Sequence, residues 1–340
     1  MNAALRIRVA KAGDADFGTI GEALASIPRN FPGATEISIA PGVYSEKLRI
    51  ENPRVSLLGS GRNATIISFD DHALRLLPSG ERMNTFNSYT LYVGASDFSA
   101  RDLCVANPAG EGRLVGQAVA CHVDADRAGF CRCGFKARQD TLCLGPLPSN
   151  PLPKGLNLQH PANIAAGNGG MNPFRQYFRD CLIEGDVDFI FGSAAAVFQG
   201  CLIRSLDSGD GVKGYIAAPS TLPGQAFGFV FLDCRLEGPA RKGSAFLARP
   251  WRRSAKAAYI GCWMGEHIST AGWDNWGDPD NEKSAEFVES GSHGPGAPAG
   301  QDSGRRAGWA HSLDAGKASR FSPQAVLSCE DGWSPWKGMG

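Results

Sequence analysis

The sequence lacks several features that would assign the protein to a common class. It has no run of about 18 apolar residues, so no membrane-spanning helix is predicted. Its 34 basic and 34 acidic residues give a net charge of zero, which argues against a nucleic-acid binder, since such proteins usually carry a basic excess. Hydrophobic residues make up 43% and charged residues 20%, as in a soluble globular protein rather than a disordered chain.

The N-terminal sequence, MNAALRIRVAKAG, lacks the long apolar segment and the cleavage site of a signal peptide. Two expectations stay open: the protein remains inside the cell, or the chain begins after an export signal.

Several catalytic motifs are also missing. No serine lies in a G-x-S-x-G elbow, which counts against an α/β-hydrolase triad. No glycine-rich phosphate loop occurs between a strand and a helix, and the six histidines show no metal-ligand spacing.

Helical periodicity is scarce. Only residues 18–27, just before Pro28, have the pattern of an amphipathic helix. Short β-prone segments punctuated by Gly, Asn, Asp and Pro take its place. They are residues 36–40, 55–59, 90–94, 117–123 and 227–232.

One pattern recurs along the chain: a large apolar residue, two residues, a cysteine, one residue, and a second large apolar residue. Many short strands at a roughly constant period suggest a sandwich, a barrel or a β-solenoid, and a solenoid absorbs irregular spacing as loops on one face. A degenerate copy lacks the cysteine and has Phe98, Arg101 and Leu103. The full copies are Phe130/Cys133/Phe135, Phe178/Cys181/Ile183, Phe198/Cys201/Ile203, Phe231/Cys234/Leu236 and Tyr259/Cys262/Met264.

Five of the ten cysteines occupy this repeat. Equivalent residues of successive solenoid turns stack inside, where cysteine is a small apolar filler, so we predict an interior ladder of free thiols. A zinc site is the alternative, although the spacings are far longer than those of zinc ligands. The Pro/Gly/Asn-rich segment 145–171 is predicted to be a long loop. The turn-rich region after about Asn275 is expected to pack back along the solenoid.

Two segments carry candidate chemistry: ARQDTL (137–142) and EGDVDFIFGSA (184–194). Strand alternation would put Asp188 and Ile190 on one face and Phe189 and Phe191 on the other. A buried aspartate needs a partner, for which Arg249 in FLARPW is the candidate. Asp186 is interpreted as a turn residue, whereas for Asp188 a structural and a functional role are about equally supported.

In this order, GQAVA, RQDTL, RQYFRDCLIEGDVDFIFGSAAAVFQGC and ARPW closely resemble the pectin methylesterase (pectinesterase) family. Supporting segments include APGVYSEKLRI and TFNSYT, and the resemblance runs from about residue 8 to about residue 327. It implies an all-β fold, a right-handed parallel β-helix with a short N-terminal helix and long loops on one face. Residues 1–340 would form one such domain, with 145–171 as an insertion.

The resemblance also implies roles for individual residues. Asp188 corresponds to the nucleophile and Asp140 to the general acid, which later acts as a base. Gln117 and Gln139 correspond to the amides that stabilise the oxyanion, and Arg249 to the residue that holds the nucleophile. The implied substrate contacts are Trp251, Phe86, Phe191, Thr85 and Trp273.

The chemistry is consistent with these roles, because amide donors stabilise an oxyanion and methoxide needs a proton to leave. We therefore predict that Asp188 is ionised and Asp140 protonated when the cycle begins. The chain departs from the family pattern at Leu114, Cys143 and EGDVD (184–188). We hypothesise that loop 145–171 restricts access to short or heavily methylated oligomers.

The implied substrate is methyl-esterified pectin or oligogalacturonides, with no cofactor, no metal, no nucleic acid and no membrane span. A secreted or periplasmic monomer is expected. Arg252, Arg253 and Lys256 form either a solvated charged turn or a patch that attracts the acidic polymer. Three alternatives stay open: a polygalacturonase or pectate lyase on the same architecture, a non-catalytic carbohydrate-binding β-helix, and an esterase or thioesterase for another ester.

Overall fold

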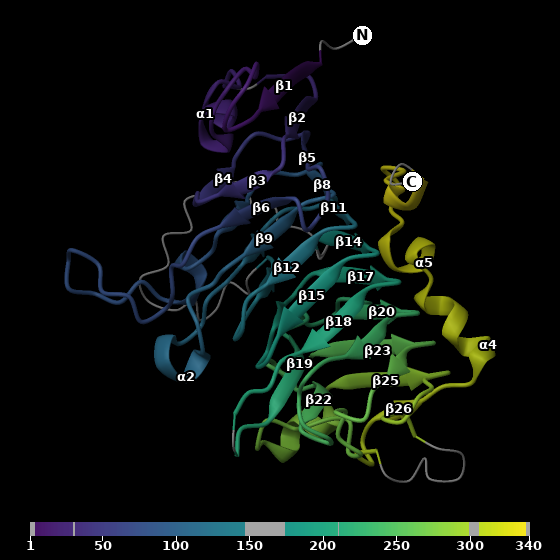
Figure 1. The fold of residues 1–340 in the computed structure, drawn as a ribbon. Coiled ribbons are helices and arrows are strands. Elements are labelled where there is room, and N and C mark those ends of the chain that lie inside the picture. Colours follow the sequence, from purple (N-terminus) through teal and green to yellow (C-terminus); the bar gives the residue numbers. More distant parts are fainter. Residues whose placement is uncertain (1–3, 30, 147–173, 210, 299–305, 338–340) are drawn as a thin grey trace.

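A computed structural model describes residues 4–29, 31–146, 174–209, 211–298 and 306–337. Apart from residues 145 and 146, the predicted loop 145–171 lies outside these described residues. Within them, all pairings between the named strands are parallel. The strands form three sheets, and along much of the chain each coil contributes one strand to each sheet in turn (Figure 1). The β-solenoid predicted from the repeat is confirmed as a parallel β-helix.

We call the three sheets sheet 1, sheet 2 and sheet 3, and most coils pass through them in the order sheet 1, sheet 3, sheet 2. Sheet 1 contains β1 (Leu5–Val9), β2 (Thr35–Ile39), β5 (Val55–Leu58), β8 (Ser99–Arg101), β11 (Ala128–Cys131), β14 (Arg175–Arg179), β17 (Ala195–Gln199), β20 (Phe229–Leu232), β23 (Lys256–Ile260), β25 (Glu286–Ser290) and β26 (His311–Ser312). Sheet 2 contains β4 (Leu48–Ile50), β7 (Leu91–Val93), β10 (Cys121–Val123), β13 (Leu142–Leu144), β16 (Ile190–Gly192), β19 (Gly214–Pro219) and β22 (Ala245–Ala248). Sheet 3 contains β3 (Gly42–Tyr44), β6 (Thr65–Ser68), β9 (Cys104–Ala106), β12 (Gly134–Lys136), β15 (Leu182–Gly185), β18 (Leu202–Ser205), β21 (Arg235–Glu237) and β24 (Trp263–Met264).

Short helices lie at the ends and in the loops of this β-helix (Figure 1). The α-helices are α1 (Ile20–Ala25), α2 (Gly112–Val115), α4 (Ala315–Ala318) and α5 (Pro323–Leu327). The 3₁₀ helices are η1 (Thr85–Asn87), η2 (Pro279–Lys283), η4 (Ser319–Phe321) and η5 (Pro335–Lys337). None of the helices among the described residues has the length and apolar character needed to cross a membrane.

The aromatic residues of the repeat stack inside the helix, one from each coil. Successive ring centroids lie 4.8, 4.8, 4.7 and 4.3 Å apart, with interplanar angles of 14° or less. All five side chains are almost fully buried, so stacking combines apolar burial with offset ring contact. The stack runs through Phe130, Phe178, Phe198, Phe231 and Tyr259.

The cysteines of the repeat form the predicted interior ladder of free thiols. Each is buried and unbridged. Along most of the ladder the thiol donates to the carbonyl oxygen of the aromatic residue on the preceding coil, as from Cys234 Sγ to Phe198 O at 3.3 Å. No group of three or more potential metal ligands occurs among the described residues, so the alternative of a zinc site has no support there. The ladder consists of Cys133, Cys181, Cys201, Cys234 and Cys262.

Helix α1 closes the N-terminal end of the interior. Thr19 caps it in a capping box with Glu22, and Ile20 and Ala23 are buried in the main core. The helix predicted at residues 18–27 is therefore confirmed with somewhat narrower bounds, Ile20–Ala25.

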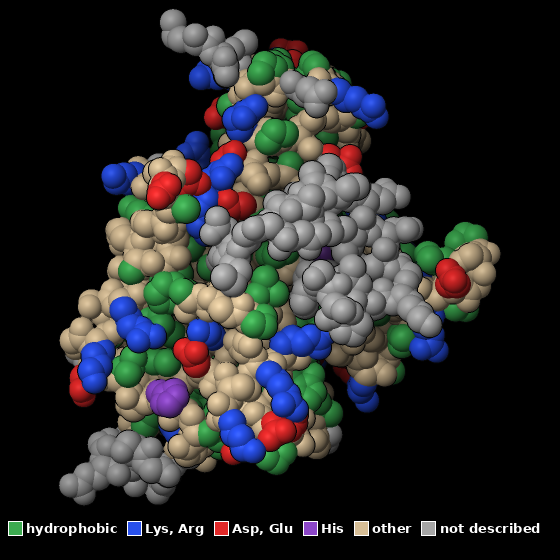
Figure 2. Space-filling model, turned by 180° about the vertical axis from the view of Figure 1, so that it is seen from behind, with side chains coloured by type: hydrophobic (Ala, Val, Ile, Leu, Met, Phe, Trp, Pro, Cys, Tyr) green, Lys and Arg blue, Asp and Glu red, His purple; other side chains and the backbone are tan. Residues whose placement is uncertain are grey.

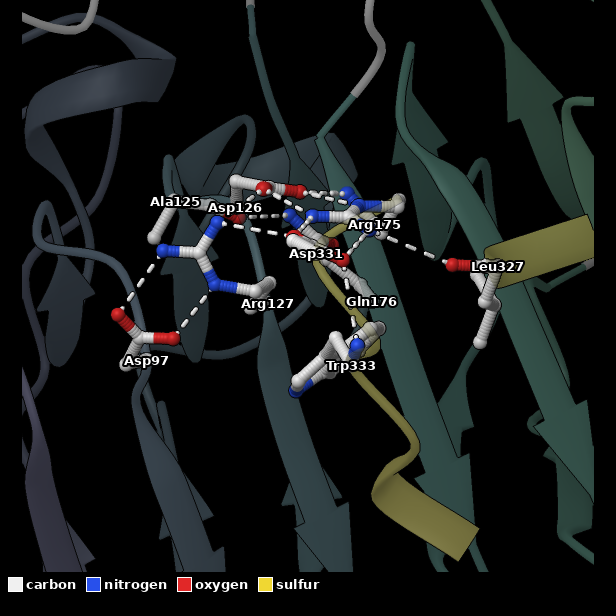
Figure 3. Close-up of polar contacts among 9 residues, drawn as sticks. All are labelled: Asp97, Ala125, Asp126, Arg127, Arg175, Gln176, Leu327, Asp331 and Trp333. Atoms are coloured by element: carbon white, nitrogen blue, oxygen red, sulfur yellow. Dashed lines mark hydrogen bonds and ion pairs between the residues drawn. The ribbon is translucent and has the colours of Figure 1, made fainter. Parts of the chain in front are cut away.

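The C-terminal segment returns along sheet 1, as predicted for the region after Asn275 (Figure 1). Leu327 of α5 packs with Tyr177 and Val197 on the outer side of the sheet. An ion-pair network then fastens the segment (Figure 3). Arg175 bridges Asp126 and Asp331, with Nη2–Oδ2 distances of 2.7 and 2.5 Å.

The thiol ladder predicts selective reactivity. Burial raises the pKa of Cys133, Cys181 and Cys201 well above the ordinary thiol value, and only the thiolate is nucleophilic. In the native protein we expect an aromatic disulfide reagent at pH 8 to react quickly with Cys329, the exposed cysteine, and with the buried ones only after unfolding. Cys329→Ser should abolish the fast phase. Rapid reaction of several thiols in the folded protein would contradict the ladder.

Candidate active site

The two candidate aspartates lie next to each other on successive coils. Asp140 precedes β13 and Asp188 precedes β16, and two residues later Leu142 is paired with Ile190. The Asp140 N–H donates to the Val187 carbonyl at 3.0 Å, so the parallel register already holds at this point. Adjacent strands lie about 4.8 Å apart, so the backbones of the two aspartates lie about one strand spacing apart.

Both aspartates adopt left-handed backbone conformations, with φ of 64° at Asp140 and 50° at Asp188. This turn breaks the strand alternation predicted around Asp188. Phe189 and Ile190 both face the main interior core, whereas Phe191 faces a separate aromatic cluster outside it. The prediction that Asp188 shares a face with Ile190, and Phe189 with Phe191, is therefore wrong. Regular alternation begins only at Ile190, where β16 starts.

Arg249 forms a bidentate ion pair with Asp188. Its Nε donates to Oδ1 at 2.8 Å and its Nη2 to Oδ2 at 2.6 Å. The guanidinium lies between the rings of Tyr215 and Trp276, with Cζ 3.8 Å from each ring centroid. Planar bidentate pairing and stacking on both faces fix the orientation of the Asp188 carboxylate.

The electrostatic environments of the two aspartates differ. Burial raises the pKa of Asp140 well above the ordinary carboxyl value, and the charge of Asp188 raises it further. Burial also raises the pKa of Asp188, but two hydrogen bonds and the charge of Arg249 oppose this shift. Because Arg249 bonds directly to Asp188, it affects Asp140 only through its more distant charge. These directions agree with a protonated Asp140 beside an ionised Asp188.

Both glutamines lie close to Asp140. The strand predicted at 117–123 covers only Cys121–Val123, so Gln117 lies in the preceding irregular segment. The Ala118 N–H donates to the Gln139 carbonyl at 3.2 Å, which places the backbones of Gln117 and Gln139 on adjacent coils. Both side chains are half-buried, and the Gln139 side chain acts on Asp140 in the direction that lowers its pKa. A Cβ at Gly112 of α2 would collide with the Gln139 side chain, so this glycine allows a close approach.

Aromatic side chains form a cluster beside the aspartates. The rings of Phe86 and Phe191 lie 6.5 Å apart, and those of Phe191 and Trp251 lie 5.9 Å apart. Three of the predicted substrate contacts are thus brought together on the outside of sheet 2. Thr85, a fourth, is half-buried in η1, next to Phe86.

The fifth predicted contact, Trp273, requires a correction. Its side chain is only 3% exposed and lies in the interior core between Tyr259 and Phe287. It therefore cannot contact a polymer on the surface. Trp276, three residues later, is 39% exposed and covers Arg249. The spacing of the two tryptophans in GWDNW could have indicated that they have different environments, but it does not show which one is buried.

The sequence analysis also missed the residues that extend the aromatic cluster across sheet 2. The strand register places the centres of β4, β7, β10, β13 and β16 in one row. The His122 ring lies edge-on to Tyr92 at 5.1 Å, and Arg49 lies 4.4 Å above Tyr92. Each is the central residue of a three-residue strand, a signal too short to recognise in isolation. The row is Arg49, Tyr92, His122, Cys143 and Phe191.

The basic residues after Trp251 are largely paired. Arg253 Nη2 lies 3.4 Å from Asp280 and Lys256 Nζ lies 2.8 Å from Glu286, while Arg252 stacks on Trp251. Basic and acidic side chains also occur next to each other on the face drawn in Figure 2. This favours a solvated charged turn over a patch that attracts the polymer.

Comparisons with known proteins agree on one family. The family profile described as Pectinesterase matches residues 6–145 and 171–330. Pectinesterase 31 of Arabidopsis thaliana is 30% identical over 341 residues, covering 97% of this chain and 94% of that protein. The structure of a pectin methylesterase from carrot is 29% identical, with a TM-score of 0.78 and coverage of 94% and 92%. A pectin methylesterase in complex with a hexasaccharide is 28% identical, with a TM-score of 0.77 and coverage of 97% and 98%.

The elevated pKa of Asp140 predicts that this residue limits stability. Asp140 binds a proton on folding, whereas the unfolded chain is ionised above about pH 4. The native state therefore loses up to about 1.4 kcal/mol of stability per pH unit as the pH rises from there to the folded-state pKa. Asp140→Asn removes this dependence. We expect the difference in Tm between Asp140→Asn and wild type to grow with pH. A Tm difference that stays constant from pH 4 to 8 in thermal unfolding would contradict the raised pKa of Asp140.

Proposed function

The chain belongs to the pectinesterase family, and from this premise we propose that it hydrolyses the methyl esters of pectin with Asp188 as nucleophile. The observation that carries the proposal is the bidentate contact of Arg249 with Asp188, next to Asp140, whose pKa is raised well above normal. One carboxylate is oriented and kept charged, and the other is kept as an acid. A covalent ester hydrolysis needs this pair of states.

In the first half of the reaction, an Asp188 oxygen attacks the carbonyl carbon of a galacturonate methyl ester. The amide groups of Gln117 and Gln139 donate hydrogen bonds to the oxyanion of the tetrahedral intermediate. When the intermediate collapses, the bond to the methoxy group breaks and Asp140 gives its proton to the departing oxygen. Methanol leaves, and a mixed anhydride between Asp188 and the galacturonyl group remains.

In the second half, Asp140 is a carboxylate and acts as the base. It takes a proton from water as the water oxygen attacks the galacturonyl carbon of the anhydride. The anhydride bond breaks, which returns the Asp188 carboxylate to Arg249 and releases the product as galacturonic acid, whose remaining proton passes to solvent. Asp140 is again protonated, so the cycle closes without a cofactor.

Phe86, Phe191 and Trp251 supply an apolar surface on which we place the sugar rings, with Thr85 at its edge. The solved relative that contains a hexasaccharide supports an oligomeric or polymeric uronate as substrate. Trp276 takes the place that the sequence analysis gave to Trp273, because it is exposed and covers Arg249.

Three further proposals follow from this function. We propose that the enzyme is secreted or periplasmic, in which case it would meet its substrate in plant cell walls or their debris. We also propose that it acts as a monomer. Residues 1–340 are proposed to be one domain, since sheet 1 runs without interruption from β1 to β26.

The direct test is methanol release from highly methylated pectin. Purified wild-type protein should release methanol with or without a metal chelator, whereas Asp188→Ala should release none. New reducing ends or unsaturated products in place of methanol would indicate a glycosidase or lyase. Absence of methanol from both pectin and methylated oligogalacturonides would reject the proposal.

The pH dependence follows from the two ionisation states. Activity should fall at low pH as Asp188 becomes protonated, and at high pH as Asp140 loses its proton. The alkaline limb should lie well above the ordinary carboxyl pKa, because burial and the charge of Asp188 raise the pKa of Asp140. The measurement is kcat/KM for methanol release from a methylated oligomer between pH 4 and 10. A profile that rises steadily to pH 10 would contradict a role for Asp140 as an acid.

A further inference from the structure

One buried ion pair outside the proposed catalytic residues connects the turns that carry both aspartates. Asp186 is 5% exposed, and each of its carboxylate oxygens has a different partner. Oδ2 accepts from Arg138 Nε at 2.9 Å, and Oδ1 accepts from the Val187 N–H at 2.8 Å. Arg138 lies two residues before Asp140, and Val187 directly precedes Asp188.

Arg138 has further contacts on the neighbouring coils. Its Nη2 donates to the Asp207 carbonyl at 2.6 Å, and its own carbonyl accepts from the Asp186 N–H at 3.0 Å. The side-chain pair and the backbone bond therefore join the same two residues. The hydrogen bond to the Asp207 carbonyl extends this connection to the segment that follows β18.

We propose that the Asp186–Arg138 pair is a positioning element that holds the turns of Asp140 and Asp188 in register for the reaction. This inference rests on the proposed function of the two aspartates. Asp186 itself has no role in the proposed chemical steps, and it was interpreted from the sequence as a turn residue.

The need for such an element arises from the backbone. Asp140 and Asp188 both have positive φ, a conformation that costs energy for non-glycine residues, although aspartate tolerates it better than most. A catalytic carboxylate that shifts by about 1 Å can lose roughly a hundredfold in rate. By bonding to both turns at once, Asp186 constrains the spacing between the nucleophile and the acid.

Asp186 also acts through its charge. Its carboxylate is one of the groups that raise the pKa of Asp140. Asp186→Asn would keep the shape of the side chain and remove the charge. The alkaline limb of activity should then move to lower pH, because Asp140 would lose its proton more easily. A residue that merely stabilised the fold would not move this limb.

The kinetic test compares Asp186→Asn, Arg138→Gln and the double variant with wild type. We expect each single variant to lower kcat by about 10- to 100-fold with little change in KM, since positioning affects the chemical step. The double variant should be no worse than the poorer single one, because the two residues act as a unit. Unchanged kcat in both single variants would overturn the proposal.

Asp102→Asn is the matched control. Asp102, like Asp140 and Asp188, has a positive φ, here 56°, and pairs with Arg132 through two hydrogen bonds of 2.8 Å. It is more exposed than Asp186 and lies on a turn that leads into sheet 3. It should leave kcat and the pH profile unchanged, even if its Tm falls. An equal loss of kcat in Asp102→Asn would show that the effect of Asp186 is general destabilisation, which would also overturn the proposal.

A second measurement does not depend on turnover. Titration of the Asp140 carboxyl by carbon-13 NMR, assigned with Asp140→Asn, should give a lower pKa in Asp186→Asn than in wild type. An unchanged pKa would refute the electrostatic part of the role. If the wild type released no methanol from any methylated uronide, the proposed function would fail, and this titration would still decide whether Asp186 acts on Asp140.

Discussion

The parallel register between successive coils is the constraint on which both the core and the site depend. Inside the helix, it places one aromatic ring and one thiol of each coil against their counterparts on the next, so a short repeat becomes a continuous core. At the edge of sheet 2, the same register places Asp140 against Asp188. Two carboxyl groups on adjacent coils repel each other when both are ionised, and the charge of Asp188 accordingly raises the pKa of Asp140. The chemistry that we propose uses this constraint.

The surrounding residues resolve the conflict by treating the two carboxyl groups differently. Arg249 bonds to Asp188 through two nitrogen atoms and is itself held between Tyr215 and Trp276, so the favoured location of the negative charge is fixed. Asp140 is about equally buried, but Arg249 bonds to Asp188 instead, so burial and the charge of Asp188 favour the neutral form of Asp140. In the mechanism that we propose, the division between nucleophile and acid thus comes from the partners of two chemically identical side chains. It does not come from the side chains themselves.

The sequence predicted those features that repeat or that have a local cause. The interior ladder was predictable because its apolar and cysteine positions recur in five successive coils, and helix α1 because its periodicity is local. Features that depend on turn geometry were not. Alternation failed at Asp188 because its positive φ interrupts the extended backbone just before β16. Strand 117–123 was predicted too long because apolar residues Ala118 and Val119 are buried without joining the ladder of sheet 2.

Trp273 and Trp276 differ only in which side of a tight turn they occupy, and no local pattern encodes that. The Arg138–Asp186 pair joins residues 48 positions apart and became visible only in the structure.

The most direct test of the central claim, that Asp188 attacks the ester and forms an anhydride, is interception of that intermediate. Hydroxylamine reacts rapidly with acyl anhydrides, so it should divert the galacturonyl group to a hydroxamate while methanol release continues. The account predicts an enzyme-dependent hydroxamate from a methylated oligogalacturonide, above the background without enzyme, and none with Asp188→Ala. Methanol release by the wild type with only free galacturonate as product, at hydroxylamine concentrations that trap a model mixed anhydride completely, would contradict the covalent mechanism.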